Sequence, residues 1–287
     1  MKLGVISDIH VDNYILWNQL TDVIVDTSLS HGVDVLAVCG DITNDIRLFE
    51  SFFRYLSSSL LKNNTQILVT PGNHDVWVYK PQNPIPNSKE KYYEVIPKVL
   101  SSMENVHYLP IKPYVKDGHA FVGSMGWYDY SFIDNYDTGT LSSTIRKSLD
   151  KHWFDKKYIW WGPHQARLEE DNVSILNEML SSLKRDLNRV KTYKDITVCL
   201  HMVPKFEFCR SSLELDLFSA YMGTDKMYEL IKKYRNVRRV LFGHTHYTFD
   251  RTIGDVRYIN ASIGLKYQNK NKPMSIYVRE RMKFIDI

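Results

Sequence analysis

The chain has 287 residues, which is long enough to bury a substantial core in one large domain or two small ones. Hydrophobic residues make up 44% of it and charged residues 24%, the composition of an ordinary globular protein. The 37 Lys and Arg against 33 Asp and Glu leave a formal net charge of +4, too small a surplus to require a polyanionic partner. Basic residues gather at 184–191 and 232–239, where solvated helix faces and strand ends explain them more simply than nucleic acid. A nucleic-acid partner is thus possible but not indicated.

Three cysteines, Cys39, Cys199 and Cys209, show no Cys-x-x-Cys spacing. An odd number without a framework is typical of a reducing compartment. The chain opens on a strand-like segment without the long apolar stretch of a signal peptide, and no apolar run has the length needed to span a bilayer. We therefore expect a cytoplasmic protein without a membrane partner. The sequence leaves the oligomeric state open.

The first third of the chain alternates strands with helices. Apolar runs at 3–7, 33–38 and 66–69 predict buried strands. Apolar residues recur at helical spacing over 14–28 and 48–60. This alternation favours a layered α/β fold.

The middle of the chain is less regular. We expect a loop at 81–87, a helix near 89–103 and a long helix over about 163–189. Strand-like segments fall at 106–109, 114–115 and 120–122. The stretch 127–161 is aromatic and weakly periodic, and we interpret it as a loop or lid. Residues 80–190 are therefore expected to form an insertion or lid region within a single domain, 1–287.

The final part returns to alternating elements. A strand at 196–200 and a helix near 225–235 precede a strand at 239–242. Beyond these, the segments that alternate like antiparallel strands are 249–253, 256–259, 274–278 and 282–285.

Short polar clusters follow five of the predicted strands. The clusters are Asp8-Ile9-His10, Gly40-Asp41, Gly72-Asn73-His74-Asp75, His201 and Gly243-His244-Thr245-His246. Because ligands of open α/β sheets bind beyond the carboxyl ends of the strands, these clusters can converge on one place. Carboxylate, imidazole and amide oxygen are suitable ligands for divalent metals, and the glycines permit sharp turns and close backbone approach.

Each cluster alone has a simpler explanation. Asp-x-His or Gly-Asp can be a helix cap or a turn, His201 can be an ordinary polar residue at a strand end, and Gly72-Asn73-His74-Asp75 can be a turn. Gly-His-Thr-His is harder to explain in this way, because two imidazoles held together need a metal or an acid to satisfy them. The occurrence of all five in this order indicates a metal site.

This order of motifs resembles that of the calcineurin-like metallophosphoesterase superfamily, D-x-H, G-D, G-N-H-D/E, H and G-H-x-H. The resemblance extends from Asp8 to His246. It implies two packed mixed β-sheets flanked by helices, a four-layer αββα sandwich with a dimetal centre at one end. It also implies that Asp8, His10 and His246 hold one metal, that Asn73, His201 and His244 hold the second, and that Asp41 bridges the two. His74 would lie outside the ligands as an acid or a transition-state stabiliser.

The implied reaction is hydrolysis of a phosphate ester by a hydroxide that bridges two divalent ions. Mn²⁺, Fe or Zn²⁺ suits the mixed nitrogen and oxygen ligands. Protein phosphatases of this superfamily carry G-D-x-V-D-R-G, and the carboxylate that orients their catalytic His falls here at Asn44, without the phosphate-binding Arg. Asn44 or its neighbour Asp45 remains a candidate partner of His74. The departure weakens the protein-phosphatase interpretation.

Substrate choice is expected to depend on the aromatic middle region. The segment 127–132 and the aromatic residues Trp153, Phe154, Tyr158, Trp160 and Trp161 could form a wall on which a base or another flat group stacks, with Trp127 and Tyr128 as candidate substrate contacts. The alternative is that these aromatic residues pack a lid against the sandwich. We therefore expect a small-molecule phosphodiester or phosphoanhydride, such as a nucleotide. The alternatives are a nuclease of the same superfamily and a non-catalytic protein-binding scaffold of the same fold.

Overall fold

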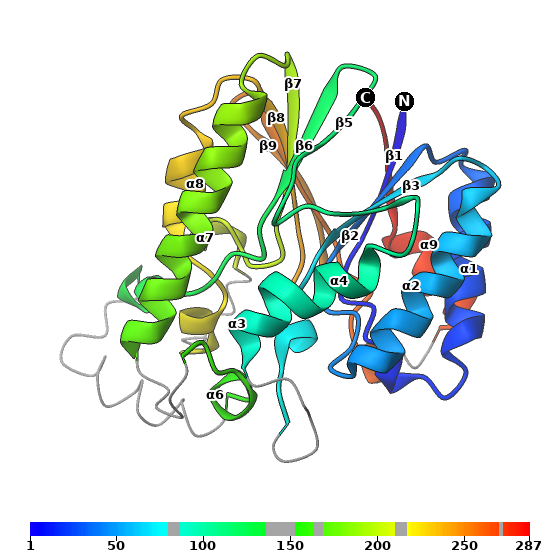
Figure 1. The fold of residues 1–287 in the computed structure, drawn as a ribbon, viewed down its shortest axis with the longest axis horizontal. Coiled ribbons are helices and arrows are strands. Elements are labelled where there is room, and N and C mark those ends of the chain that lie inside the picture. Colours follow the sequence, from blue (N-terminus) through cyan, green and yellow to red (C-terminus); the bar gives the residue numbers. More distant parts are fainter. Residues whose placement is uncertain (80–86, 136–152, 163–168, 210–216, 270–271) are drawn as a thin grey trace.

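Two β-sheets form the framework of the computed structural model, which describes residues 1–79, 87–135, 153–162, 169–209, 217–269 and 272–287 (Figure 1). The first sheet has the strand order β11-β1-β2-β3-β4 and the second β5-β6-β7-β8-β10-β9. The strands of the first sheet are β1 (Lys2–Ile6), β2 (Val35–Cys39), β3 (Gln66–Thr70), β4 (Val106–Tyr108) and β11 (Lys283–Asp286). Those of the second are β5 (Tyr114–Lys116), β6 (His119–Gly123), β7 (Asp195–Cys199), β8 (Val237–Phe242), β9 (Thr248–Ile253) and β10 (Val256–Ala261).

Most neighbouring strands run parallel. In the first sheet β1, β2, β3 and β4 pair in parallel, and in the second β6, β7, β8 and β10 do so. The antiparallel pairs are β1 with β11, β5 with β6 and β9 with β10. The carboxyl ends of the parallel strands therefore meet at one end of each sheet, where the loops can combine into a site.

Alternate side chains of the strands face opposite layers. Leu3 and Val5 of β1 share a fully buried cluster with Leu241 of β8 and Ile259 of β10, so the two sheets pack face to face. Ile6 points the other way and belongs to the larger core that includes the helices. The sheets thus form the two inner layers of a sandwich.

Helices cover the outer face of each sheet, which completes an α/β/β/α sandwich (Figure 1). In Figure 1, α1, α2 and α9 lie beside the first sheet and α7 and α8 beside the second. The helices are α1 (Trp17–Ser30), α2 (Ile46–Leu61), α3 (Ser88–Glu90), α4 (Ile96–Leu100), α6 (Asp155–Tyr158), α7 (Glu169–Val190), α8 (Asp225–Ile231) and α9 (Met274–Arg281). A π-helical turn, Lys91–Val95, joins α3 to α4. Single 3₁₀ turns lie at Val11–Asn13, His74–Val76, Ser131–Asn135, Phe206–Phe208, Leu217–Tyr221 and Lys266–Asn269.

The helix α2 illustrates why these segments are helical. Asp45 precedes it and accepts hydrogen bonds from the backbone N–H groups of Arg47 and Leu48, which otherwise lack partners at a helix start. Phe49, Phe53 and the other apolar residues at intervals of three and four are fully buried. The predicted helix over 48–60 is confirmed with slightly wider bounds.

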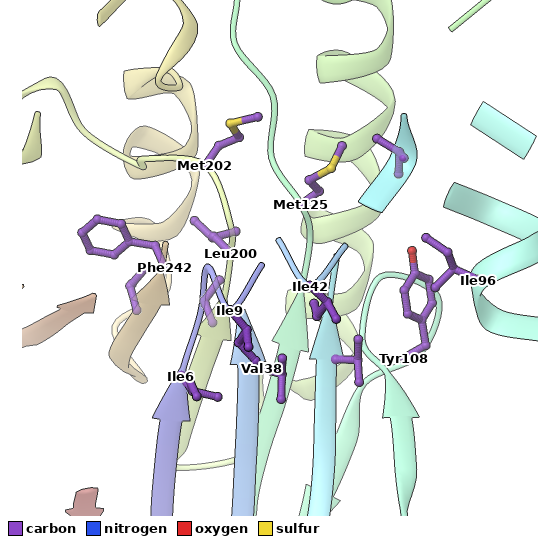
Figure 2. Packing of buried hydrophobic residues seen from close by; sticks show 14 of the residues in the cluster. Ile6, Ile9, Val38, Ile42, Ile96, Tyr108, Met125, Leu200, Met202 and Phe242 are labelled. Atoms are coloured by element: carbon purple, nitrogen blue, oxygen red, sulfur yellow. The ribbon is translucent and has the colours of Figure 1, made fainter. Parts of the chain in front are cut away.

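The first apolar residue beyond two strands also belongs to the core. Figure 2 shows Ile9 and Ile42 just beyond the ends of β1 and β2, in the same cluster as Leu200 and Met125. Both isoleucines are fully buried. Each therefore anchors the loop that carries the polar residues on either side of it.

The predicted strands and helices are otherwise found close to their expected places, with one correction. Residues 274–278, expected as a strand, form the start of α9. The apolar alternation was misleading, because Tyr277 and its neighbour Val278 are both buried while Ile276 is 46% exposed. The Tyr277 hydroxyl meets the Tyr14 hydroxyl at 2.7 Å, which ties α9 to the region before α1.

The range 80–190, expected as an insertion, contains parts of the framework. β4 belongs to the first sheet, and β5 and β6 belong to the second. The predicted loop 81–87 and the start of the predicted helix 163–189 fall almost wholly outside the described residues. Within the described part of the chain, no helix is both long and apolar enough to cross a membrane.

Candidate metal centre and substrate pocket

The loops that follow five strands bring the predicted ligands to the end of the sandwich where α6 lies (Figure 1). Asp8 and His10 follow β1, and Asp41 follows β2. Asn73 follows β3, His201 follows β7, and His244 and His246 follow β8. All of them are buried except His246, which is partly exposed. The two sheets thus contribute to one cluster.

The backbone of this cluster has an unusual conformation. Eight non-glycine residues of the described chain have positive φ, and five of them are predicted ligands. Their φ angles are 51° for Asp8, 45° for His10, 55° for Asp41, 71° for His244 and 57° for His246. A left-handed residue with a Cβ costs about 1–2 kcal/mol. Strain of this kind gathers where surrounding structure enforces it, which is typical of functional sites.

Two glycines allow the loops to approach one another. A Cβ on Gly40 would lie 2.4 Å from Nδ1 of His201, and a Cβ on Gly72 would lie 2.2 Å from Oδ1 of Asp41. Asp75 then fastens these loops together, because its buried carboxylate accepts hydrogen bonds from the N–H groups of Ile42, Thr43 and Gly72. The last residue of Gly72-Asn73-His74-Asp75 therefore has a structural role.

One group of possible ligand atoms combines Asp8, His10, Asp41 and His246, whose ligand atoms all lie within 4.8 Å of one another. Nε2 of His10 is 3.1 Å from Nε2 of His246. Nε2 of His246 is 3.5 Å from Oδ1 of Asp8, and Nε2 of His10 is 3.8 Å from Oδ2 of Asp41. These are the residues that the resemblance assigned to one metal and to the bridge.

A second group combines Asp41, His201 and His244, again within 4.8 Å. Nε2 of His201 is 3.4 Å from Oδ1 of Asp41 and 3.0 Å from Oδ1 of Asn73. Asp41 belongs to both groups, and its role as the bridge stays a prediction.

The contacts of His201 fit a cation. Its Nδ1 lies 2.9 Å from the carbonyl oxygen of Cys39, which can only accept, so Nδ1 carries the proton. In the neutral ring Nε2 then carries a lone pair and can only accept a hydrogen bond. It faces oxygens of Asn73 and Asp41, which are also acceptors. Such an arrangement needs a positive charge, either a proton on Nε2 or a metal ion.

The charges of the buried histidines agree with this. Burial, and then the charge of His74, lower the pKa of His10 to about 3. Burial and His201 do the same to the pKa of His244, also to about 3, so both rings are neutral near pH 7. Burial also opposes a charge on His201, but Asp41, Asp8 and the carbonyl group of Cys39 together outweigh it, and the pKa of His201 rises to about 9. An ion that binds His201 must therefore displace a proton.

His74 lies at the rim of the cluster with a different set of neighbours. Its ring stacks on Trp77 with centroids 3.9 Å apart, and its Nε2 is 4.0 Å from Oδ2 of Asp41. Among the described contacts, the two expected partners hydrogen-bond elsewhere. Asn44 donates to Oδ2 of Asp12 at 3.0 Å, and Asp45 caps α2. The charge of His74 also acts on Asp12: burial raises the pKa of Asp12, and His74 acts to lower it.

A pocket of about 320 Å³ opens from the metal-ligand cluster. Its lining includes the predicted ligands Asn73, His244 and His246 and three aromatic residues, Trp77, Trp153 and Phe154, which we call the aromatic wall. The remaining lining residues are Asp41, His74, Asp155, Cys209, Ser219, Met222, Thr245, Tyr247 and Gln268. Among these described lining residues there is no Lys or Arg. The size is suitable for a small molecule.

Trp127 and Tyr128 lie elsewhere. They are 0% and 1% exposed, belong to the core and do not line the pocket. The indole N–H of Trp127 donates to Asn172 at 2.7 Å. Trp153 and Phe154 of the same aromatic stretch line the pocket instead, because aromatic density does not tell which rings face the core.

Of the residues that line the pocket, Trp77 and Asp155 were not expected as site residues, whereas Trp153 belongs to the expected aromatic wall. The indole N–H groups of both tryptophans donate to Asp155, at 2.6 and 2.9 Å. Trp77 lies two residues beyond the motif that ends at Asp75, and this closeness was the available signal. Nothing in the sequence around Asp155 distinguishes it from a surface acid.

The sequence profile of the calcineurin-like phosphoesterases matches residues 1–248. Among solved structures, a phosphopantetheinyl hydrolase from Mycobacterium tuberculosis superposes with a TM-score of 0.73 at 19% identity, covering 99% of this chain and 95% of that one. A dimetal phosphatase from Danio rerio has a TM-score of 0.50 at 16% identity, covering 91% and 86%. No curated protein sequence matches the chain.

The chain belongs to the calcineurin-like phosphoesterase family, and it is a metal-dependent phosphoesterase. The family normally binds two divalent metals, and the chain supplies two groups of residues that can hold them. The predicted fold is confirmed by the two mixed sheets with flanking helices.

Proposed function

We propose that this protein hydrolyses a phosphodiester or phosphoanhydride of a small molecule that carries a flat or apolar group, such as a nucleotide. The observation that carries the proposal is that one pocket is lined both by the predicted ligands Asn73, His244 and His246 and by the wall of Trp77, Trp153 and Phe154. A phosphate held at these ligands would leave room for its organic group against the aromatic rings.

Asp8, His10 and His246 would hold one divalent ion, Asn73, His201 and His244 the other, and Asp41 both. When bound, the ions would neutralise the charge of the phosphate and activate water as the nucleophile. Mn²⁺, Fe or Zn²⁺ suits this set of nitrogen and oxygen donors.

His74 would supply the proton that the leaving oxygen needs. It is partly exposed and lines the pocket, so a substrate can reach it. Its stacking on Trp77 holds the ring at the boundary between the ligand cluster and the aromatic wall.

The charge of the pocket favours a small substrate over nucleic acid. A phosphodiester carries one negative charge, which the two ions can balance. Nucleases also contact neighbouring phosphates, usually through Lys and Arg, and no described lining residue is of either type. The phosphopantetheinyl hydrolase of similar fold is named for a group attached through phosphate, so esters of this group belong among the substrates to test. A non-catalytic scaffold is disfavoured, because all seven predicted ligands are present and lie together.

The test is metal analysis of the purified protein, followed by a substrate panel with added Mn²⁺. The panel compares bis(p-nitrophenyl) phosphate, p-nitrophenyl phosphate, cyclic nucleotides, dinucleotides, a phosphopantetheinylated carrier protein and single-stranded DNA. We expect bound metal and a preference for a small diester or anhydride. A protein that binds no metal and hydrolyses none of these substrates would contradict the proposed enzymatic function. A preference for DNA would favour the alternative that the protein is a nuclease.

A further inference from the structure

A single buried carboxylate joins the metal-ligand cluster to the pocket wall. Asp155 begins the short helix α6 and is 2% exposed. Its Oδ1 accepts hydrogen bonds from Nδ2 of Asn73 at 2.9 Å and from Nε1 of Trp77 at 2.6 Å. Its Oδ2 accepts from Nε1 of Trp153 at 2.9 Å. Three donors from three positions of the chain therefore converge on one side chain.

The bond to Asn73 decides which way its amide points. A side-chain amide has a donor end and an acceptor end, and the two are interchanged by a flip. Asp155 has only acceptors, so it takes the NH₂ end and leaves Oδ1 of Asn73 facing Nε2 of His201 at 3.0 Å. Only this orientation offers an oxygen to a metal ion.

The bonds to the indoles fix two faces of the pocket. Trp77 stacks on His74, and Trp153 stacks on Tyr221 with centroids 4.8 Å apart and an angle of 15° between the planes. Because each indole has only one N–H, its bond to Asp155 sets the rotation of the ring in its plane. The same carboxylate therefore determines where a flat substrate group can lie.

We propose that Asp155 is a positioning residue that couples metal binding to substrate binding, by orienting the ligand Asn73 and the wall residues Trp77 and Trp153 at once. The inference rests on the proposed function, since it assigns Asn73 to a metal. A backbone hydrogen bond also holds α6 against the metal-ligand loops. The N–H group of Val78, in the segment after His74, donates to the carbonyl oxygen of Tyr158, the last residue of α6.

Substitutions at Asp155 separate the two roles. Asp155→Ala removes all three bonds, and we expect the affinity of the metal-free protein for Mn²⁺ to fall about 10- to 100-fold, as for other groups that orient metal ligands. In Asp155→Asn the amide oxygen can still serve the two donors Asn73 and Trp77, while the NH₂ group faces the N–H of Trp153. That variant should keep most of its Mn²⁺ affinity and raise KM about 3- to 10-fold through the lost bond to Trp153.

Trp153→Phe provides an independent check, because it keeps an aromatic ring but removes the N–H. When Trp153→Phe is combined with Asp155→Asn, it also removes the unfavourable contact between the new side-chain NH₂ group at position 155 and the indole N–H of Trp153. The double variant should therefore have a KM no higher than Asp155→Asn alone, which is a non-additive result. These two variants keep the general shape of the pocket, so they test the inference even if Asp155→Ala does not fold.

The matched control is Asp186→Asn on α7, another fully buried carboxylate that does not line the pocket. Mn²⁺ titration by calorimetry, KM and kcat on the best diester of the panel, and melting of the metal-free proteins are measured for every variant. Loss of Mn²⁺ affinity in Asp155→Ala but not in Asp186→Asn supports the inference. Wild-type metal affinity in Asp155→Ala, or additive effects of Asp155→Asn and Trp153→Phe, would overturn it. A wild-type protein that binds no Mn²⁺ overturns the proposed function and this inference together.

Discussion

The metal-ligand loops and the aromatic wall share one pocket but are held in different ways. The loops are held by backbone: five ligands have a left-handed conformation, and Gly40 and Gly72 leave room for no other residue. The wall is held by side chains, through the stacking of Trp77 and Trp153 and their bonds to Asp155. Loops whose shape depends on backbone conformation tolerate few substitutions, whereas a wall made of side chains can change by substitution of one residue at a time. The chemistry is therefore the constrained part of the pocket and the fit to substrate the adjustable part.

The strongest test of the constrained part is Asp41→Asn. Asp41 is the only residue common to both groups of ligands, so the loss of its charge affects both ions. We expect turnover to fall to the background rate and the bound metal to be lost, measured by steady-state kinetics and elemental analysis. Asp250→Asn, an exposed acid paired with Arg257 at 2.7 Å, is the control and should behave as wild type. Full metal content in Asp41→Asn would contradict the bridging role.

His74→Gln separates acid catalysis from metal binding. Metal content should stay unchanged while kcat falls about 10²-fold, the usual contribution of a general acid. The effect should be smaller for p-nitrophenyl esters than for alkyl esters, because p-nitrophenolate leaves without a proton. An equal loss for both kinds of leaving group would contradict the acid role, and loss of metal would mean that His74 is a ligand.

Gly40→Ala compared with Gly118→Ala isolates the close approach at the site. Both glycines have similar positive φ, 86° and 81°, so both variants share a strain of about 1–2 kcal/mol. A Cβ on Gly118 meets nothing within 4 Å, but one on Gly40 collides with His201 and Gly72. Denaturant unfolding should show a larger loss of stability for Gly40→Ala, and only that variant should lose Mn²⁺ affinity. Equal losses of stability and of Mn²⁺ affinity in the two variants would show that the loops can shift to accommodate a Cβ on Gly40.

Phe154→Ala tests the adjustable part. Phe154 is 61% exposed and lines the pocket, so its removal should leave stability unchanged. We expect KM for aryl or nucleotide diesters to rise about 2- to 10-fold, the usual effect of an aromatic contact, with little change for an alkyl diester. Ile111→Ala, at an exposed position outside the pocket, is the control. A KM that rises equally for alkyl diesters would argue against ring stacking.

Lys91 lies where the two regions meet and gives the smallest expected effect. Its fully buried Nζ donates to the carbonyl oxygens of Asn44 and Trp77, at 3.1 and 2.9 Å. Burial lowers the pKa of Lys91 from 10.5 to about 8, although Asp75 opposes the shift. Between pH 8 and 10 the unfolded chain keeps a proton that the folded protein has released, so this lysine makes stability rise with pH. Urea unfolding should show this rise in the wild type and not in Lys91→Met. A rise of equal size in both would exclude Lys91 as its source.

The sequence was sufficient for the framework and for the ligand cluster. Strand positions follow from apolar runs, and parallel strands bring their carboxyl ends together, so Asp8, Asp41 and His201 meet although they lie far apart in the chain. Residues 274–278 were predicted as a strand but form a helix, because a short alternation of apolar residues fits both a strand and one helical turn.

The same reasoning could not decide which residues of the aromatic stretch form the wall. Trp127 and Trp153 belong to one aromatic stretch, and only tertiary packing sends the first into the core and the second to the pocket. Asn44 was matched to a family position, but its side chain turns to Asp12. Side-chain direction in irregular segments depends on neighbours distant in sequence, which no local pattern contains.

The left-handed ligands also have a consequence for the metal-free protein. Strain concentrated in the loops at Asp8, His10, Asp41, His244 and His246 lowers the cost of opening them locally. An ion that binds only the closed form offsets that strain by linkage, so its removal should expose these loops first. Hydrogen exchange and limited proteolysis after chelation would then report the dimetal centre as the least protected end of an otherwise intact sandwich.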